Sequence, residues 1–147
     1  MSKGDTFEND LLKLIFTNAD AALIGDATGL RGSSTAGSLY VSLHTADPAE
    51  AGTQSTSETA YTSYARVAVC RVSGSCGWVV TGNSVSPGSL ISFPACTGST
   101  STITHFAVGT ASTGAGKVLY SGTVTPNINV STGVTPQLTT SSTITED

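Results

Sequence analysis

The stretch LYVSLHTADPAEAGTQ, residues 39–54, contains the strongest fold signal in this chain. Its first six residues alternate between apolar and polar side chains, which predicts a strand with one apolar face. Asp47 and Pro48 end this strand, because proline cannot join a central ladder and biases the residue before it away from the helical region. A long polar loop follows at residues 49–63, and residues 66–71 alternate again as a return strand. This strand-loop-strand pattern predicts a β-rich fold.

The composition indicates one charge-poor domain. The chain has 147 residues, enough for a domain with its own core. Charged residues make up 11% of it, well below the roughly 25% that is usual. A surface this neutral suits a subunit packed against copies of itself or a partner, although a monomeric, Thr-rich β domain has the same composition. The net charge of −4 argues against a nucleic-acid-binding surface, which needs clustered Lys and Arg.

The N-terminal sequence and the cysteines indicate the cellular compartment in which the protein folds. The first ten residues contain no apolar signal region, and no apolar stretch approaches the length of a membrane span. We therefore expect folding in the cytoplasm. Cys70, Cys76 and Cys96 are an odd number without a closely spaced metal-binding pair. Cys70 and Cys76 can bridge if their strands pair, but reduced thiols are expected in the cytosol, and the sequence leaves the disulfide question open.

One segment near the N-terminus has the pattern of an amphipathic helix. Asp5 and Glu8 have the spacing of a capping box, with Thr6 as the alternative cap, and the helix is expected to end near residues 17–18. Residues 19–24 are a candidate for a further short turn or helix. The apolar face of the helix is predicted to either cover the protein's own sheet or dock on a neighbouring subunit. It carries Phe7, Leu11, Leu14 and Ile15, and Leu12 and Phe16 widen it.

Beyond residue 38 the chain has the pattern of short strands and turns. Together with a short N-terminal helix, six to eight such strands predict a mainly β, single-domain β-sandwich or jelly-roll-like fold. We divide the chain into a helix and Gly/Ser-rich loop at residues 1–37, a β-sandwich body at residues 38–123, and a C-terminal strand or arm of the same domain at residues 124–147. The predicted strands cover residues 39–44, 66–71, 77–81, 90–93, 103–109 and 117–122, with a Gly-rich hairpin at residues 113–116.

No set of residues matches a catalytic template. His44 and His105 lie inside predicted strands, and no G-x-S-x-G elbow presents a nucleophilic serine. The acids gather at a helix start, in the long loop and at the C-terminus, where charge is favoured without catalysis. Asp47 and Glu50 are too few ligands for calcium. We therefore predict a protein that is not an enzyme, with no catalytic residues, no cofactor and no metal site.

The order of the segments resembles a known protein family. FENDLLKLIF (7–16), SLYVSLHTADPAEAGTQ (38–54) and YTSYARVAV (61–69) follow one another, and ISFPACTG (91–98) and THFAVGTASTGAGKVLYSG (104–122) complete the pattern. From end to end the chain resembles a family of small tailed-bacteriophage virion proteins, often labelled phage tail fibre protein. The resemblance implies a structural part of the virion with no known activity.

The candidate interaction residues lie in the loop and on the helix. Asp47, Pro48, Glu50 and Arg66 belong to the loop and its return strand, and the apolar helix face described above completes the set. Arg66 either anchors the loop by pairing with Asp47 or Glu50, or is a solvent-exposed charge on a strand. If the loop bridges subunits, deleting residues 49–60 is expected to leave a folded domain that no longer assembles on particles.

Two positions on the phage particle, the capsid and the tail, are consistent with this sequence. We predict a small capsid decoration or cement subunit that stabilises the assembled particle, with a tail or tail-fibre component involved in host attachment as the alternative. The sequence has no internal repeat or heptads, which argues against a long fibre shaft. The expected partners are the major capsid protein or tail subunits and further copies of the chain in a homo-oligomer, with no nucleic acid and no membrane. The expected location is the virion, assembled in the host bacterial cytoplasm.

Overall fold

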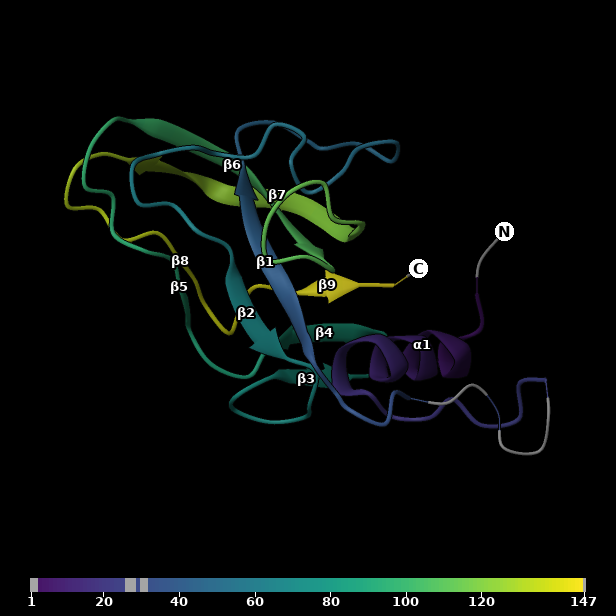
Figure 1. The fold of residues 1–147 in the computed structure, drawn as a ribbon. Helices are drawn as coiled ribbons and strands as arrows, with labels where there is room; N and C mark the ends of the chain where they lie inside the picture. The colour runs from purple at the N-terminus through teal and green to yellow at the C-terminus, as the bar shows by residue number, and fades with distance from the viewer. Residues whose placement is uncertain (1–2, 26–28, 30–31, 147) are drawn as a thin grey trace. The chain divides into compact units, whose positions relative to one another are not determined.

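The computed structural model describes residues 3–25, 29 and 32–146, so the loop predicted for residues 25–38 lies partly outside the described residues. Strands and isolated β-bridges together account for 39% of the described residues and helix for 9%, which confirms the predicted mainly β fold with one short N-terminal helix (Figure 1). The described elements are α1 (Asp5–Thr17), β1 (Ser38–His44), β2 (Val67–Cys70), β3 (Trp78–Thr81), β4 (Ser84–Pro87), β5 (Ile91–Ser92), β6 (Ser101–Gly109), β7 (Val118–Val130), β8 (Gln137–Leu138) and β9 (Ile144–Thr145).

The chain divides into two compact units that interleave in sequence. The first unit consists of Met1–Ser38, Val69–Leu90 and Thr139–Asp147, and the second of Leu39–Ala68 and Ile91–Leu138. The first unit contains α1 and the antiparallel sheet β3-β4-β9. The second contains most of the sheet β2-β1-β6-β7 and the small pair β5-β8. The division at residues 38 and 124 within one domain stays a prediction.

Helix α1 begins without the predicted cap. Its N-cap residue is Gly4, which has an extended backbone, and no side chain caps the helix, so the capping box expected at Asp5 and Glu8 is wrong. Both acids still lie in the first turn, where the positive end of the helix dipole favours negative charge. The predicted end is confirmed, because the helix stops at Thr17 and Asn18 follows in the left-handed conformation with φ 58°.

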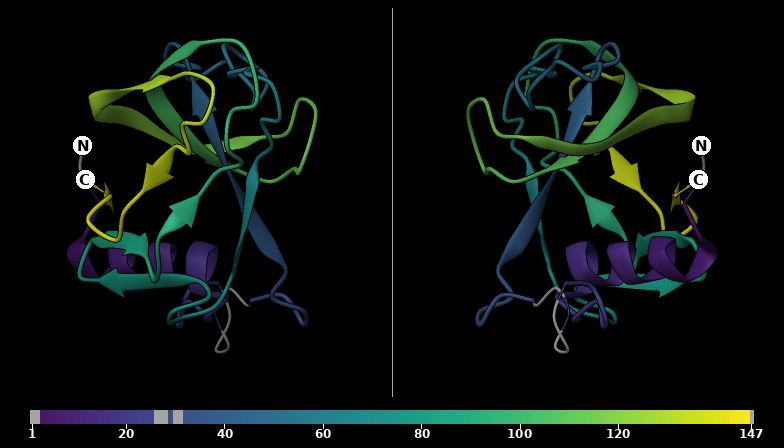
Figure 2. Two further views of the ribbon diagram at one scale, coloured as in Figure 1. Left: turned by 90° about the vertical axis from the view of Figure 1, so that its left-hand side faces the viewer. Right: turned by 90° about the vertical axis from the view of Figure 1, so that its right-hand side faces the viewer.

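The buried face of α1 is centred on the two residues expected only to widen the apolar face. Leu12 and Phe16 are fully buried. Phe16 packs edge-on against Trp78 of β3, with 4.8 Å between the ring centroids. The helix therefore covers the first unit's own sheet, beside β3 and β4 (Figure 2). The four residues predicted to form the buried face are instead half-buried or exposed: Leu11, Leu14 and Ile15, and Phe7 at 42% exposed.

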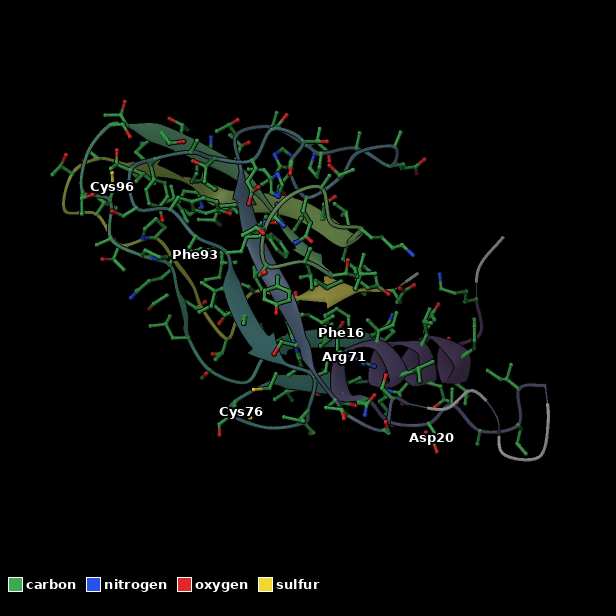
Figure 3. The ribbon with its side chains drawn as sticks, viewed as in Figure 1. Phe16, Asp20, Arg71, Cys76, Phe93 and Cys96 are labelled. Atoms are coloured by element: carbon green, nitrogen blue, oxygen red, sulfur yellow. The ribbon has the colours of Figure 1, made fainter. Side chains whose placement is uncertain are left out.

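Arg71 stabilises the C-terminal end of α1 (Figure 3). Its Nε donates to the Ile15 carbonyl at 2.7 Å and its guanidinium nitrogens donate to the carbonyls of Leu14 at 2.7 Å and Ala36 at 3.2 Å. A cation that hydrogen-bonds the last carbonyls of a helix complements the negative end of the dipole. Residues 19–24, described in full, form a bridge and a turn and no further helix.

The central strands of the second unit are β1 and β6. They pair antiparallel, with Leu43 opposite Phe106, and β6 pairs in turn with β7. The predicted apolar face of β1 is confirmed, since Leu39, Val41 and Leu43 are buried. The other face is buried as well, because Ser42 and His44 are fully inaccessible. A strand covered on both faces needs partners for its polar side chains, and these partners define the site described next.

Two strands depart from prediction. Ser84–Pro87 forms β4 and pairs with β3, although its Ser-Val-Ser-Pro sequence is short and ends in proline. Strand β7 continues to Val130, well past the predicted end at residue 122. Strand β4 contains two serines and a proline, and β7 contains a proline and two asparagines, residue types that local propensity assigns to turns. Backbone pairing with an established neighbour overrides that preference.

Candidate interaction site

The long loop, residues 45–65, joins β1 to β2 and is held in place by backbone hydrogen bonds. Thr45 N–H donates to the Ser57 carbonyl and Thr59 N–H donates to the Leu43 carbonyl, both at 2.9 Å. Gln54 N–H donates at 2.9 Å to the Gly116 carbonyl, which lies in the hairpin between β6 and β7 (Figure 1). The sequence pattern identified this loop as polar and long, but its backbone is tied to the sheet and the hairpin.

A buried glutamine links the long loop to the hairpin. The Gln54 side chain is fully buried, and its Oε1 accepts the Ala111 N–H at 2.9 Å while its Nε2 donates to the Tyr40 carbonyl at 3.2 Å. Space for this side chain exists because residue 109 is glycine, where a Cβ would lie 2.2 Å from Gln54 Cδ. Sequence reasoning missed Gln54, because a single glutamine in a polar loop gives no periodic signal.

A buried ion pair fixes the return strand to the loop. Arg66 Nε donates to Glu58 Oε1 and Arg66 NH2 donates to Glu58 Oε2, each at 2.7 Å, in a bidentate pair. The Arg66 side chain is 2% exposed and also donates to the carbonyls of Ala111 and Gly114 in the hairpin. The expected pairing of Arg66 with Asp47 or Glu50 is wrong, and so is the alternative of an exposed strand charge. The partner, Glu58, is in the same loop.

Tyr64 completes this cluster. Its hydroxyl donates to Glu58 Oε1 at 2.8 Å and accepts the Leu43 N–H at 3.1 Å. Burial raises the pKa of the Tyr64 hydroxyl far above its usual range, so it stays a hydrogen-bond donor at any ordinary pH. Gln54, Glu58, Tyr64 and Arg66 therefore form one connected polar cluster with β1 and the hairpin, called the loop anchor below. The anchor argues against the expectation that residues 49–60 can be deleted without unfolding, since that segment contains Gln54 and Glu58.

His44 is the last residue of β1, and its side chain is buried. Its Nε2 is 2.9 Å from Ser42 Oγ and its Nδ1 is 2.9 Å from the Thr56 carbonyl oxygen, so Nδ1 carries a proton in either charge state. Burial lowers the pKa of His44 below its ordinary 6.5, and the hydrogen bond to Thr56 offsets only part of that effect. The imidazole is therefore neutral and structural, and Ser42 is held as its neighbour in the strand.

This burial predicts a pH dependence of stability. Because the folded-state pKa of His44 is depressed, only the unfolded chain takes up a proton as the pH falls below about 6.5. The stability is fully present above that pH and decreases below it, at no more than about 1.4 kcal/mol per pH unit. Denaturant titrations at pH 7.5, 6.5 and 5.5 measure this slope. His44→Gln should flatten this slope, and a wild-type slope in His44→Gln would contradict the assignment.

The tip of the long loop is the exposed part of the site. Asp47 and Glu50 are exposed, while Pro48 between them is buried. Asp47 Oδ1 accepts the Ala49 N–H at 2.9 Å, which turns the chain locally. Gly52 packs against this turn, because a Cβ there would lie 1.8 Å from the Pro48 carbonyl oxygen. In the described part of the chain the Glu50 carboxylate has no partner, so it is available to a neighbouring molecule.

The predicted interaction residues are thus separated by the fold. Asp47, Pro48 and Glu50 lie together at the loop tip, whereas Arg66 lies inside the loop anchor and supports the loop from within. The four helix residues belong to the first unit, where Phe7 is the most exposed of them. Glu58 and Tyr64, which the sequence analysis did not select, hold the loop in position.

The described residues contain no group of three or more His, Cys, Asp or Glu side chains placed to hold a metal ion. Among the same residues, no helix is long and apolar enough to cross a membrane.

Comparison with known proteins gives one family. The family described as Podophage GP4 fiber I protein gp80 matches residues 3–145. No match was found among curated proteins. The matched range includes α1, every strand and the loop anchor, so the similarity concerns the chain as a whole.

Proposed function

Because this chain belongs to the Podophage GP4 fiber I protein gp80 family, a family of phage fibre proteins, we propose that it is a structural component of a phage tail fibre. The observation that carries the proposal is the extent of the match, residues 3–145. Because the family model covers nearly the whole given chain, the similarity extends beyond any single motif. The chain contributes contacts and no chemistry.

The loop anchor supports such a role physically. A loop that must recognise a neighbouring protein or a host surface binds more tightly when it is already ordered, since less conformational entropy is lost on binding. Gln54 and the Glu58–Arg66 pair order the long loop from below and leave its tip exposed. In this proposal the tip contacts another virion component or the host, and the anchor keeps it in one conformation.

The family description favours the tail-fibre alternative over the capsid decoration subunit that composition and loop length suggested. Low charge and a long loop suit both roles, so these features do not separate them. The family name supports the fibre role, because it names a fibre. We therefore propose attachment of the particle to its host as the setting in which the chain acts.

The number of copies per particle tests this proposal. Quantitative mass spectrometry of purified particles, with the major capsid protein as the internal standard, should give a few to a few tens of copies. Gold-labelled antibody against the chain should then mark the tail in electron micrographs. Hundreds of copies in simple ratio to the capsid protein, with label over the head, would overturn the fibre assignment in favour of decoration.

The exposed tip residue Glu50 provides a test of the contact surface. A phage carrying Glu50→Lys should contain less of the chain per particle or adsorb more slowly, by about tenfold if the tip lies in a specific interface. The purified variant should keep its wild-type melting temperature, because Glu50 is exposed. Thr132→Lys, a new charge at another exposed turn, is the control. Wild-type incorporation and adsorption by Glu50→Lys would exclude the tip from the interface.

We also propose that copies of the chain associate through β7. In the described part of the chain, β7 is the last strand of its sheet, and it contains no charged residue in thirteen. Uncharged edge strands offer free backbone groups to a second strand, and natural monomers protect such edges with lysine or proline. Residues Val118–Thr123 of β7 contain neither, because the proline of the strand is Pro126. Native mass spectrometry should show an oligomer that Thr123→Lys, at an exposed edge position, weakens. A monomeric wild-type chain at micromolar concentration would contradict this proposal.

A further inference from the structure

The segment between β2 and β3 brings two cysteines together. Cys70 ends β2, Cys76 lies two residues before β3, and the chain between them folds back on itself. Cys70 N–H donates to the Cys76 carbonyl at 3.3 Å, and Trp78 N–H donates to the Val72 carbonyl at 2.9 Å. These two hydrogen bonds hold the backbone at Cys70 beside the backbone at Cys76.

Gly77 is the residue that permits this close approach. A Cβ at Gly77 would lie 2.0 Å from the Val72 carbonyl oxygen and 2.7 Å from the Cys70 carbonyl oxygen. Real Cβ atoms do not come that close, so only glycine lets the two backbone segments touch here. The proximity of the cysteines is therefore built into the local sequence and does not depend on side-chain rotation.

The neighbouring Cys70 side chain raises the pKa of the Cys76 thiol, with a smaller contribution from burial. Cys76 is exposed and Cys70 is partly buried, so a small reagent reaches Cys76 first. Cys96 differs from both, because it is buried in the second unit and its thiol donates to the Gly98 carbonyl at 2.9 Å.

We propose that Cys70 and Cys76 form a dithiol that closes to an intramolecular disulfide when the chain meets a low-molecular-weight disulfide such as oxidised glutathione. The Cys76 thiolate attacks one sulfur of the small disulfide and releases one small thiol. The Cys70 thiolate then attacks Cys76 in the mixed disulfide and releases the second small thiol. Two electrons pass from the cysteines to the small disulfide, and the two cysteine protons end on the released thiols or in solvent.

The proposed Cys70–Cys76 disulfide is therefore expected to form outside the host cell. The reducing cytoplasm keeps both thiols free during assembly, whereas the surface of a released virion is an oxidising setting in which disulfides persist. The closed loop contains residues 70–76 and links the end of β2 to the segment that leads into β3. The occurrence of this bond in released particles rests on the proposed virion role, but the exchange reaction itself does not.

The test in solution uses tryptic peptides. Arg66, Arg71 and Lys117 place Cys70 on one peptide and Cys76 on the next, which also carries Cys96, so the Cys96→Ser variant removes the ambiguity. The reduced variant is incubated with oxidised glutathione at pH 8, blocked with iodoacetamide and digested without reductant. We expect one cross-linked peptide pair, reversed by dithiothreitol, and a melting temperature about 5 °C higher than that of the reduced form.

One further variant and a measurement on released particles complete the test. Cys70→Ser should stop at the mixed disulfide with glutathione on Cys76, because the resolving thiol is missing. Glutathione that stays on Cys76 of the Cys96→Ser variant with Cys70 still alkylated, or two alkylated thiols after full incubation, would overturn the proposal. Released particles blocked with iodoacetamide before any reduction give the second arm. A chain that cross-links in solution but is absent from particles would instead overturn the virion role.

Discussion

Replacing Arg66 by Ala is expected to lower the free energy of unfolding of the second unit by about 3–5 kcal/mol. The Arg66 side chain is 2% exposed and makes a bidentate pair with Glu58. Its removal leaves the largely buried Glu58 carboxylate without its cation and removes the Arg66 hydrogen bonds to the carbonyls of Ala111 and Gly114. Uncompensated buried charge is among the few single changes that produce so large a loss.

Urea titration followed by far-ultraviolet circular dichroism measures this effect. Arg66→Lys should recover part of the stability, because lysine keeps the charge but not the bidentate geometry. Lys13→Ala, which removes an exposed cation from α1 of the first unit, is the control and should cost less than about 1 kcal/mol. If Arg66→Ala costs no more than Lys13→Ala, the loop anchor does not hold the fold.

Replacing Phe16 by Ala is expected to destabilise the first unit by about 3–5 kcal/mol. Phe16 is fully buried and contacts Trp78 edge-on, with 4.8 Å between ring centroids. The substitution removes this aromatic contact and leaves a cavity between α1 and β3. Because Trp78 is the single tryptophan of the chain, its fluorescence reports unfolding of this unit directly.

Phe7→Ala is the control for the same helix. Phe7 is 42% exposed, so its truncation should cost well under about 1 kcal/mol. Comparing the Trp78 fluorescence transition with the circular dichroism transition also shows whether the two units unfold together. A similar loss of stability in both Phe variants would mean that the helix is anchored by its outer face, contrary to the burial described above.

Local sequence patterns predicted much of the fold correctly. Alternation in residues 39–44 identified β1, because strand side chains repeat every two residues whatever the rest of the chain does. Asn18 ended the helix where expected, and the Gly-rich run before β7 formed the predicted hairpin. In each case the signal and the structure it specifies lie within a few residues of each other.

The partners of buried polar groups depend on contacts that sequence spacing does not encode. The long loop contains three acids that could pair with Arg66, namely Asp47, Glu50 and Glu58. Only the folded path of the loop places Glu58 against the Arg66 guanidinium. Gln54 gave no signal at all, because its role comes from a cavity formed by Gly109 and Gly116 on another part of the chain. The apolar residues of α1 surround so much of the helix that either of two faces satisfied the helical period.

The sequence by itself determined the fold class, the helix, the main strands and the resemblance to phage fibre proteins, because all of these follow from local periodicity or from ordered motifs along the chain. The tertiary structure alone decided which face of α1 is buried and which carboxylate pairs with Arg66. These depend on the packing of segments that are distant in sequence. Burial and pairing are properties of the assembled core, since the free energy of each buried group depends on neighbours from other elements.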